Sequence, residues 1–161
     1  MSVLSLKNVK RNFHQAHKTI EVLKGIDLEV QPGELVALIG SSGSGKSTLL
    51  QISGLLDSKF SGELTIAGKE VTGISDDARS AMRNSELGFI YQFHHLLPDF
   101  SAVENVALAQ QVGGMSKAEA LKDAEKILIR LGLEDRLDHI PSKLSGGEQQ
   151  RVAIARAMVG K

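Results

Sequence analysis

The sequence predicts one α/β domain of 161 residues, in which antiparallel strands lead into a central parallel sheet that carries a helical insert. Three observations support this class. The first 35 residues alternate apolar and polar side chains, a continuous apolar run then ends at a glycine-rich loop, and the chain from about residue 95 onward shows helix caps and helical periodicity. The order of these patterns is typical of an α/β core.

Composition limits the function classes. Nineteen basic and nineteen acidic residues give a formal net charge of zero, so neither nucleic acid nor an anionic membrane surface is expected as the main partner. The absence of cysteine excludes a disulfide framework and a thiolate metal site. Apolar runs such as 35–39 are far shorter than the roughly 20 residues of a membrane-spanning helix, so no direct membrane insertion is expected.

The N-terminal part reads as strands joined by turns, with one helix. The expected elements are half-buried strands at 3–9 and 20–30, a turn at 31–34, a strand buried on both faces at 35–40, a helix at 47–56, a hairpin strand at 61–71 and a short buried strand at 87–92. The continuous run at 35–40 lacks alternation, which is typical of a central parallel strand.

The following part reads as helices with sequence-encoded ends. Ser101 with Glu104, and Ser116 with Glu119, have the spacing of a capping box. Gly132 lies where the second of these helices should end. The apolar stripe expected on that helix consists of Ala118, Leu121, Ala124, Leu128 and Leu131.

The loop "GSSGSGKST" at 40–48 is the strongest chemical signal. It follows a predicted strand and opens a predicted helix, as the phosphate-binding pattern G-x-x-x-x-G-K-[ST] requires. Glycines let backbone N–H groups converge on a phosphate, the helix N-terminus adds positive potential, and the lysine adds a full charge. The candidate ATP-binding residues are Gly40, Ser41, Ser42, Gly43, Ser44, Gly45, Lys46, Ser47 and Thr48. The alternative is a glycine-rich turn without a ligand, and a chance match has a probability on the order of 1%.

A second glycine motif, "LSGGEQQ" at 144–150, opens the last helix. Ser145 can cap that helix, while Gly146 and Gly147 expose backbone N–H groups beside it. The motif therefore predicts a second anion-binding helix terminus. The alternative is an ordinary cap in front of a helix that faces the core.

Taken in order, the phosphate loop, Gln92 after a short strand, the helical insert and LSGG-x-Q-x-R resemble the nucleotide-binding domain of ABC transporters over essentially the whole chain. The resemblance implies the P-loop NTPase fold of the ABC-ATPase type, with ATP and Mg²⁺ as ligands. It also implies a head-to-tail dimer of two copies, in which each second motif completes the ATP site of the other copy. The residues expected to contact that opposite ATP are Ser145, Gly146, Gly147 and Glu148.

The resemblance also implies roles for single residues. Lys46 and Gln92 are expected in catalysis, and Ser47 and Gln92 are expected to hold Mg²⁺. Phe13 matches the position of an aromatic residue that stacks on adenine, although a phenylalanine there could also be core.

The segment 87–108, "LGFIYQFHHLLPDFSAVENVAL", most resembles the ATPases of bacterial lipoprotein-releasing complexes. The resemblance implies transmembrane permease partners that contact the chain near Gln92–Asn105, and a peripheral location on the cytoplasmic face of the inner membrane. ATPases of efflux or cell-division complexes are the alternative. DNA-associated relatives insert long coiled coils or zinc modules that this sequence lacks, and a kinase or GTPase has no use for LSGG.

Two features of this segment stay open. His94 and His95 are adjacent and point in different directions on any regular element, so packing or a partner contact is favoured over metal binding. Leu96, Leu97 and Phe100 could be core or a surface for the partner.

The resemblance divides the domain into a P-loop core with antiparallel strands at 1–92, a helical subdomain at 93–145 and the start of the following helix at 146–161. In the family, a buried strand ending in Asp-Glu follows, and its glutamate polarises the attacking water. No such strand lies within residues 1–161, so the C-terminal part of the fold is expected to be missing. The 161-residue chain alone is predicted to aggregate and to hydrolyse ATP negligibly. If the short chain is natural, a non-hydrolysing ATP-binding module is the alternative.

Overall fold

The computed structural model describes residues 2–15 and 18–160. The chain divides into two compact units, Met1–Ser80 and Ala81–Lys161, and each is considered by itself.

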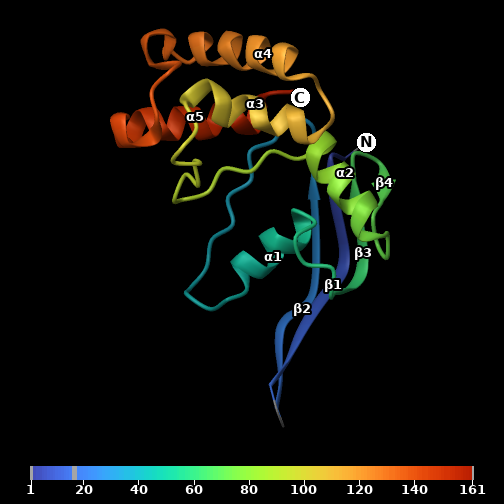
Figure 1. Cartoon of the computed structure of the whole chain (residues 1–161). Helices are drawn as coiled ribbons and strands as arrows, with labels where there is room; N and C mark the ends of the chain where they lie inside the picture. Colours follow the sequence, from blue (N-terminus) through green and yellow to red (C-terminus); the bar gives the residue numbers. More distant parts are fainter. Residues whose placement is uncertain (1, 16–17, 161) are drawn as a thin grey trace. The chain divides into compact units, whose positions relative to one another are not determined.

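The first unit is built on a four-stranded antiparallel sheet in the order β2-β1-β3-β4. The strands are β1 (Leu4–Gln15), β2 (Lys18–Val30), β3 (Ser61–Ile66) and β4 (Lys69–Glu70), and β1 and β2 form the long hairpin of Figure 1. Leu6 pairs with Leu28 on one side and Leu64 on the other. Leu6 and Leu64 are fully buried, as the alternating pattern predicts. The predicted N-terminal strands and the 61–71 hairpin are confirmed.

Helix α1 (Lys46–Ser53) packs beside this hairpin, and Leu49 and Ile52 are its buried residues (Figure 1). It begins at Lys46, within the motif at 40–48 and directly after the last glycine of that motif, which confirms the predicted loop-to-helix order. The turn at 31–34 is also confirmed, because the Glu34 N–H donates to the Gln31 carbonyl at 3.1 Å.

The expected central parallel sheet is not formed. Residues 35–40 and 87–92 contain no strand, and every strand pair among the described residues is antiparallel. Leu35 is 98% exposed and Ile39 is 89% exposed, instead of buried on both faces. A parallel strand requires a neighbour to satisfy its backbone N–H and C=O groups, and the described part of the chain places no strand beside either run.

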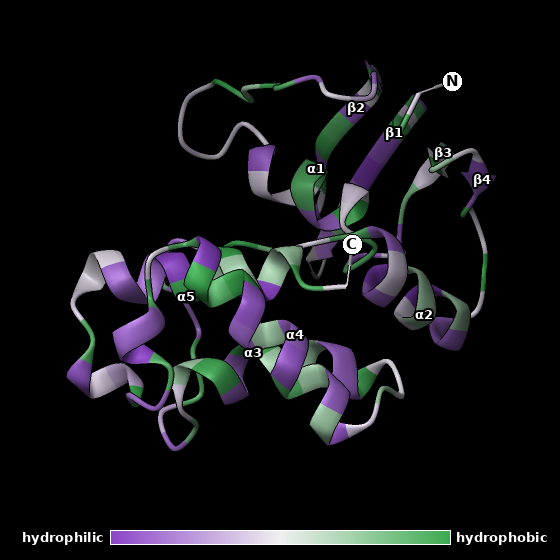
Figure 2. Ribbon diagram, turned by 90° about the horizontal axis from the view of Figure 1, so that it is seen from above, coloured by the Kyte–Doolittle hydropathy of each residue, from purple (hydrophilic) through white to green (hydrophobic). Residues whose placement is uncertain are grey.

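The second unit is helical. Its elements are α3 (Ala102–Val112), α4 (Lys117–Arg130), the 3₁₀ turns η1 (Glu134–Arg136) and η2 (Pro141–Lys143), and α5 (Gly146–Met158), whereas α2 (Asp76–Glu86) crosses the division. Hydrophobic and hydrophilic residues are mixed along α3, α4 and α5 in Figure 2. The hydrophobic ones form a single core that includes Val106, Leu128, Leu133, Leu144 and Val152. The predicted helices of the insert are confirmed.

The helix ends follow the predicted chemistry with one difference, at Ser116, and the predicted stripe on α4 differs at one position. Ser101 and Glu104 form the capping box of α3. Ser116 caps α4, but its hydroxyl donates to the Glu119 carboxylate at 2.5 Å. Gly132 adopts a positive φ of 70° after α4, as a C-terminal glycine should. The stripe on α4 was wrong at one position, because Ala118 is exposed and Ala120 is buried instead.

Within residues 2–15 and 18–160, no helix has the length and apolarity needed to cross a membrane.

Candidate functional site

The glycine-rich loop has a shape that larger residues would disturb. Gly43 and Gly45 have positive φ values of 78° and 92°. A Cβ on Gly45 would lie 3.0 Å from Leu23 Cδ2 and 3.2 Å from the Val22 carbonyl oxygen, so the loop touches β2 where it enters α1. A Cβ on Gly40 would lie 2.8 Å from Ser44 Oγ. Backbone conformation and close approach together require glycine at Gly45, whereas the close neighbour of Gly40 is a side chain that can rotate away.

Lys46 folds back over this loop. Its Nζ donates to the carbonyl oxygens of Gly40 at 2.8 Å and Ser41 at 2.6 Å, and to Ser44 Oγ at 3.4 Å. The ammonium group therefore lies within the curve of the loop. The N-terminus of α1, which follows Gly45, receives no side-chain cap. A positive charge and an uncapped helix N-terminus together form a site that favours a phosphate.

The other predicted residues of the motif differ in exposure. Ser41, Ser42 and Ser47 are exposed, and Thr48 is half-buried. A serine hydroxyl at the start of α1 is a hard oxygen donor, which fits the ligand preference of Mg²⁺.

Phe13 lies in the same unit, on β1, and is 37% exposed. The guanidinium carbon of Arg11 lies 4.0 Å from the centroid of its ring. Arg11 Nε donates to Asp57 Oδ2 at 2.7 Å, and both side chains of this pair are largely buried. Burial raises the pKa of Asp57, but hydrogen bonds from the Lys59 N–H and from Arg11 outweigh it and hold the pKa below its ordinary value. Phe13 is thus a partly exposed ring supported by a fixed cation.

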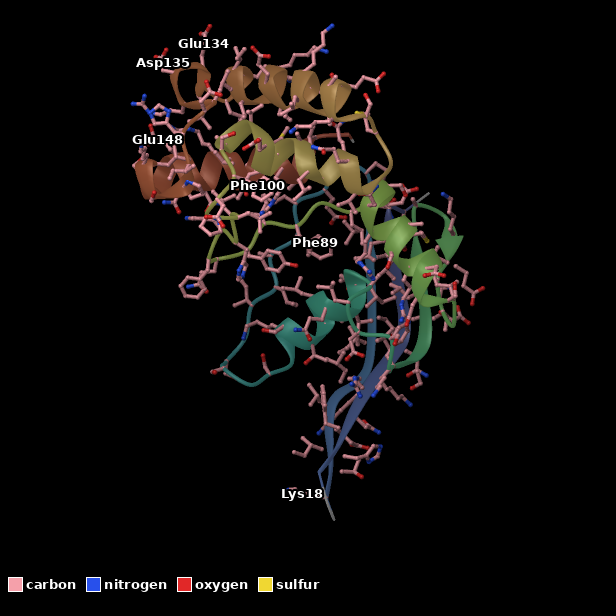
Figure 3. The ribbon with its side chains drawn as sticks, viewed as in Figure 1. Lys18, Phe89, Phe100, Glu134, Asp135 and Glu148 are labelled. Carbon is pink, nitrogen blue, oxygen red and sulfur yellow. The ribbon has the colours of Figure 1, made fainter. Side chains whose placement is uncertain are left out.

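The second motif lies in the helical unit, where Ser145 caps α5. Glu148 accepts hydrogen bonds from the Ser145 N–H at 2.7 Å and the Ser145 hydroxyl at 2.8 Å, and from Arg136 Nε at 2.9 Å. The bonds from Ser145 and then Arg136 lower the pKa of Glu148 to about 2. Figure 3 shows Glu148 at the start of α5, near Glu134 and Asp135 of η1. This helix N-terminus therefore already holds a carboxylate.

The two glycines of this motif have open surroundings. A Cβ on Gly146 would meet nothing within 4 Å, and one on Gly147 would meet only Arg151 at 4.0 Å. Neither has a positive φ. The fold of this unit does not require glycine at either position.

Gln92 is exposed in a segment held by aromatic and backbone contacts. Tyr91 stacks on Phe89 with ring centroids 5.9 Å apart, and the edge contact between Tyr91 and His95 has centroids 5.1 Å apart. Arg156 of α5 donates to the carbonyls of His94 and His95 at 2.7 Å each. Burial lowers the pKa of Arg156.

Farther along, Asn105 fixes the turn before α3. Its Oδ1 accepts from the Leu97 N–H at 2.7 Å, and its Nδ2 donates to three carbonyls. Phe100 and Leu97 stay 39% exposed, whereas Leu96 packs against the core (Figure 3 labels Phe100). Within the described part of the chain, no three His, Cys, Asp or Glu side chains gather as a metal site would require.

The predicted residues fall into two groups. The loop 40–48 and Phe13 belong to the first unit, and Gln92 and Ser145–Glu148 belong to the second. Sequence reasoning missed Arg11, Asp57, Arg136 and Arg156. Each acts through a partner distant in sequence, and no local pattern signals such a pair.

The ABC transporter family matches residues 23–161, which is most of the chain. The chain belongs to this family. Lipoprotein-releasing system ATP-binding proteins LolD are similar to it: the protein of Novosphingobium aromaticivorans is 56% identical and that of Shewanella frigidimarina 51%, each over 99% of this chain. The matches span 71% and 67% of those proteins.

Among solved structures, the dimeric ATP-binding cassette MJ0796, bound to ADP and Pi, matches with a TM-score of 0.85 at 40% identity. The match covers 98% of this chain and 69% of the cassette. The predicted ABC-ATPase fold is therefore confirmed at the level of the family, and the chain is of the ATP-binding motor type.

Proposed function

We propose that the protein is the ATP-binding motor subunit of a complex that releases lipoproteins from a bacterial inner membrane. The observation that carries the nucleotide part is the loop at 40–48, where the Lys46 ammonium group lies inside a curve of glycines before an uncapped helix. The name of the LolD relatives, at 51% and 56% identity, supports the transport part.

In this proposal the first unit binds ATP. Gly40, Gly43 and Gly45 bring backbone N–H groups to the phosphates, Lys46 transfers from the loop carbonyls to the β- and γ-phosphates, and Phe13 stacks on the adenine. Ser47 and Gln92 supply oxygen ligands for Mg²⁺, which would neutralise phosphate charge and fix the geometry of the triphosphate.

The second motif completes the ATP site of a second copy. Ser145, Gly146 and Gly147 face the γ-phosphate held by the other copy, and Glu148 lies beside them. The dimeric state named for the MJ0796 cassette supports this arrangement. Because the chain carries both halves, two copies would enclose two nucleotides.

Transmembrane permease subunits would dock near Gln92–Asn105. Phe93 is 76% exposed there, and Leu97 and Phe100 are partly exposed, so an apolar surface is available. Docking on this segment would place the protein on the cytoplasmic face of the membrane. Arg156 would join the docked segment to the helix that begins at the second motif.

The test is assembly with defined membrane subunits. We expect the protein to bind ATP and to co-purify with the permease of a lipoprotein-releasing system in an ATP-dependent manner. The matched control uses permeases of efflux and cell-division ABC systems. Preferential capture by one of these would overturn the lipoprotein assignment, and absence of ATP binding would overturn the motor function itself.

A further inference from the structure

The surroundings of Phe13 show a contact that the residue pattern did not predict. Arg11 and Phe13 are two residues apart on β1, so their side chains lie on the same face of the sheet. The Arg11 guanidinium carbon is 4.0 Å from the ring centroid, within the range of a cation–π contact. One face of the ring is therefore covered by a positive charge.

The position of this cation is fixed by Asp57. Arg11 Nε and Asp57 Oδ2 are 2.7 Å apart, and the two side chains are only 12% and 16% exposed. The Lys59 N–H donates to the other carboxylate oxygen of Asp57 at 2.8 Å, which fixes the carboxylate. A second Arg11 bond, from Nη1 to the Asn12 carbonyl at 2.6 Å, returns to β1. A guanidinium held on two sides keeps its orientation, unlike an exposed arginine.

Asp57 also connects this contact with the phosphate loop. It lies shortly after α1, the helix that begins at Lys46, and this eight-residue helix is about 12 Å long. At the other end of α1, Gly45 approaches Val22. Val22 is the extra residue of β2 at the irregularity where Arg11 pairs with Leu23 and Asn12 pairs with Glu21. Both ends of the helix are thus tied to the β1–β2 hairpin.

We propose that Arg11 is a positioning residue for the nucleobase: held by Asp57, it supports one face of Phe13, presents the other face to a purine, and sets the spacing between base and phosphate sites. This inference rests on the proposed ATP binding. In it, Arg11, Asp57 and Phe13 make the site bind a nucleotide more tightly than a free polyphosphate. Arg11 itself does not touch the reacting atoms.

The experiment compares two ligands on the full chain, MgATP and magnesium tripolyphosphate, which lacks the base. For Arg11→Gln we expect ATP to bind about 3- to 10-fold more weakly, while tripolyphosphate affinity stays unchanged. Lys10→Gln removes the same charge from the neighbouring exposed position on β1, and we expect it to leave the ratio of the two affinities unchanged. Equal losses for both ligands, or no loss for ATP, would overturn the proposal.

A buried unpaired Asp57 could unfold the single variant, so a second variant is required. Arg11→Gln combined with Asp57→Asn removes both charges, and we expect a folded protein that retains the selective loss for ATP. Full recovery of ATP affinity in this double variant would show that charge imbalance, and not support of the ring, was the cause, and would overturn the proposal.

Phe13→Ala separates this inference from the proposed function. If Phe13→Ala weakens ATP binding and Arg11→Gln does not, the role of Arg11 fails and the binding function stands. If the wild-type chain binds neither ligand, the proposed function fails, and the role of Arg11 fails with it.

Discussion

The helices α1 and α5 both begin after a serine- and glycine-containing motif, but their N-termini are in opposite electrostatic states. At α1 the N-terminus has no side-chain cap, and Lys46 places a positive charge over the loop. At α5, Ser145 caps the helix and the Glu148 carboxylate accepts bonds from the Ser145 N–H and hydroxyl. One terminus favours an external anion, and the other is stabilised by an anion of its own.

This difference suggests an order of events. We expect the first site to bind a triphosphate without help from another copy. The second site can contribute donors only to a phosphate that is already held, because its serine hydroxyl is engaged and its carboxylate repels free anions. Under the proposed function, the comparison therefore favours a composite site, in which α5 meets an ATP bound at α1 of a second copy, over two independent sites.

Removing the charge at α1 should have the largest effect. We expect Lys46→Ala to weaken ATP binding about 10- to 100-fold or more, because charge-assisted bonds to phosphate are lost and nothing else in the loop replaces them. Lys24→Ala, at an exposed position of β2, is the matched control and should bind ATP as the wild type does. Calorimetric titration with MgATP measures both. Equal affinities for Lys46→Ala and Lys24→Ala would contradict the assignment of the loop.

The sequence predicted those parts of the molecule that depend on local patterns. The loop, α1, the capping box at Ser101 and the cap at Ser145 all follow from residues within a few positions of one another. The buried strand at 35–40 did not form, because its pattern specifies burial but not the neighbouring strands that would supply it.

The charged residues that hold the predicted site residues in place could not be predicted from the sequence either. Arg11 and Asp57 are 46 positions apart, and Arg156 and His94 are 62 apart. Which charges meet over such distances is decided by packing, so a list of residue types cannot reveal it. Glu148 shows the same limit, because the resemblance predicts it as a site residue but no sequence pattern predicts its bond to Arg136.

Glycine-to-alanine substitutions should have the next largest effect, and their effect on stability should differ in sign between the N-termini of α1 and α5. Gly45→Ala should destabilise the first unit by about 1–3 kcal/mol, because φ is 92° and the new Cβ would lie 3.0 Å from Leu23. Gly146→Ala should stabilise the helical unit by about 0.4–1 kcal/mol, because the site is open and alanine favours a helix.

Denaturant unfolding of both variants measures this difference. Although Gly146→Ala should not harm the fold, its methyl group would obstruct a phosphate, so ATP-driven self-association should weaken. Undiminished self-association in Gly146→Ala would argue against a phosphate contact at α5.

A smaller effect is expected from the carboxylate at α5. In Glu148→Gln the amide oxygen can still accept from Ser145, whereas the negative charge that repels phosphate is gone. We expect ATP-driven self-association to strengthen about 2- to 5-fold, as for one charge near a surface. Glu134→Gln removes the same charge from η1 and is the matched control. Sedimentation with and without MgATP provides the measurement, and weaker association in Glu148→Gln would mean that the carboxylate assists the contact.

The smallest expected effect is a change in thermal stability as the solution is made acidic. The pKa of Glu148 lies at about 2, below its ordinary value of 4.5, so the charged form stabilises the folded helical unit. This contribution is fully present above pH 4.5 and is lost as the pH falls from there toward 2. Glu148→Gln lacks this carboxylate and therefore lacks its contribution at every pH. The difference in unfolding temperature between wild type and variant should therefore be greatest near pH 6 and should narrow as the pH falls to 3. Glu134→Gln again serves as the control in thermal unfolding followed by circular dichroism. A difference that stays constant between pH 6 and pH 3 would show that ionisation of Glu148 is not linked to folding, and would contradict the lowered pKa.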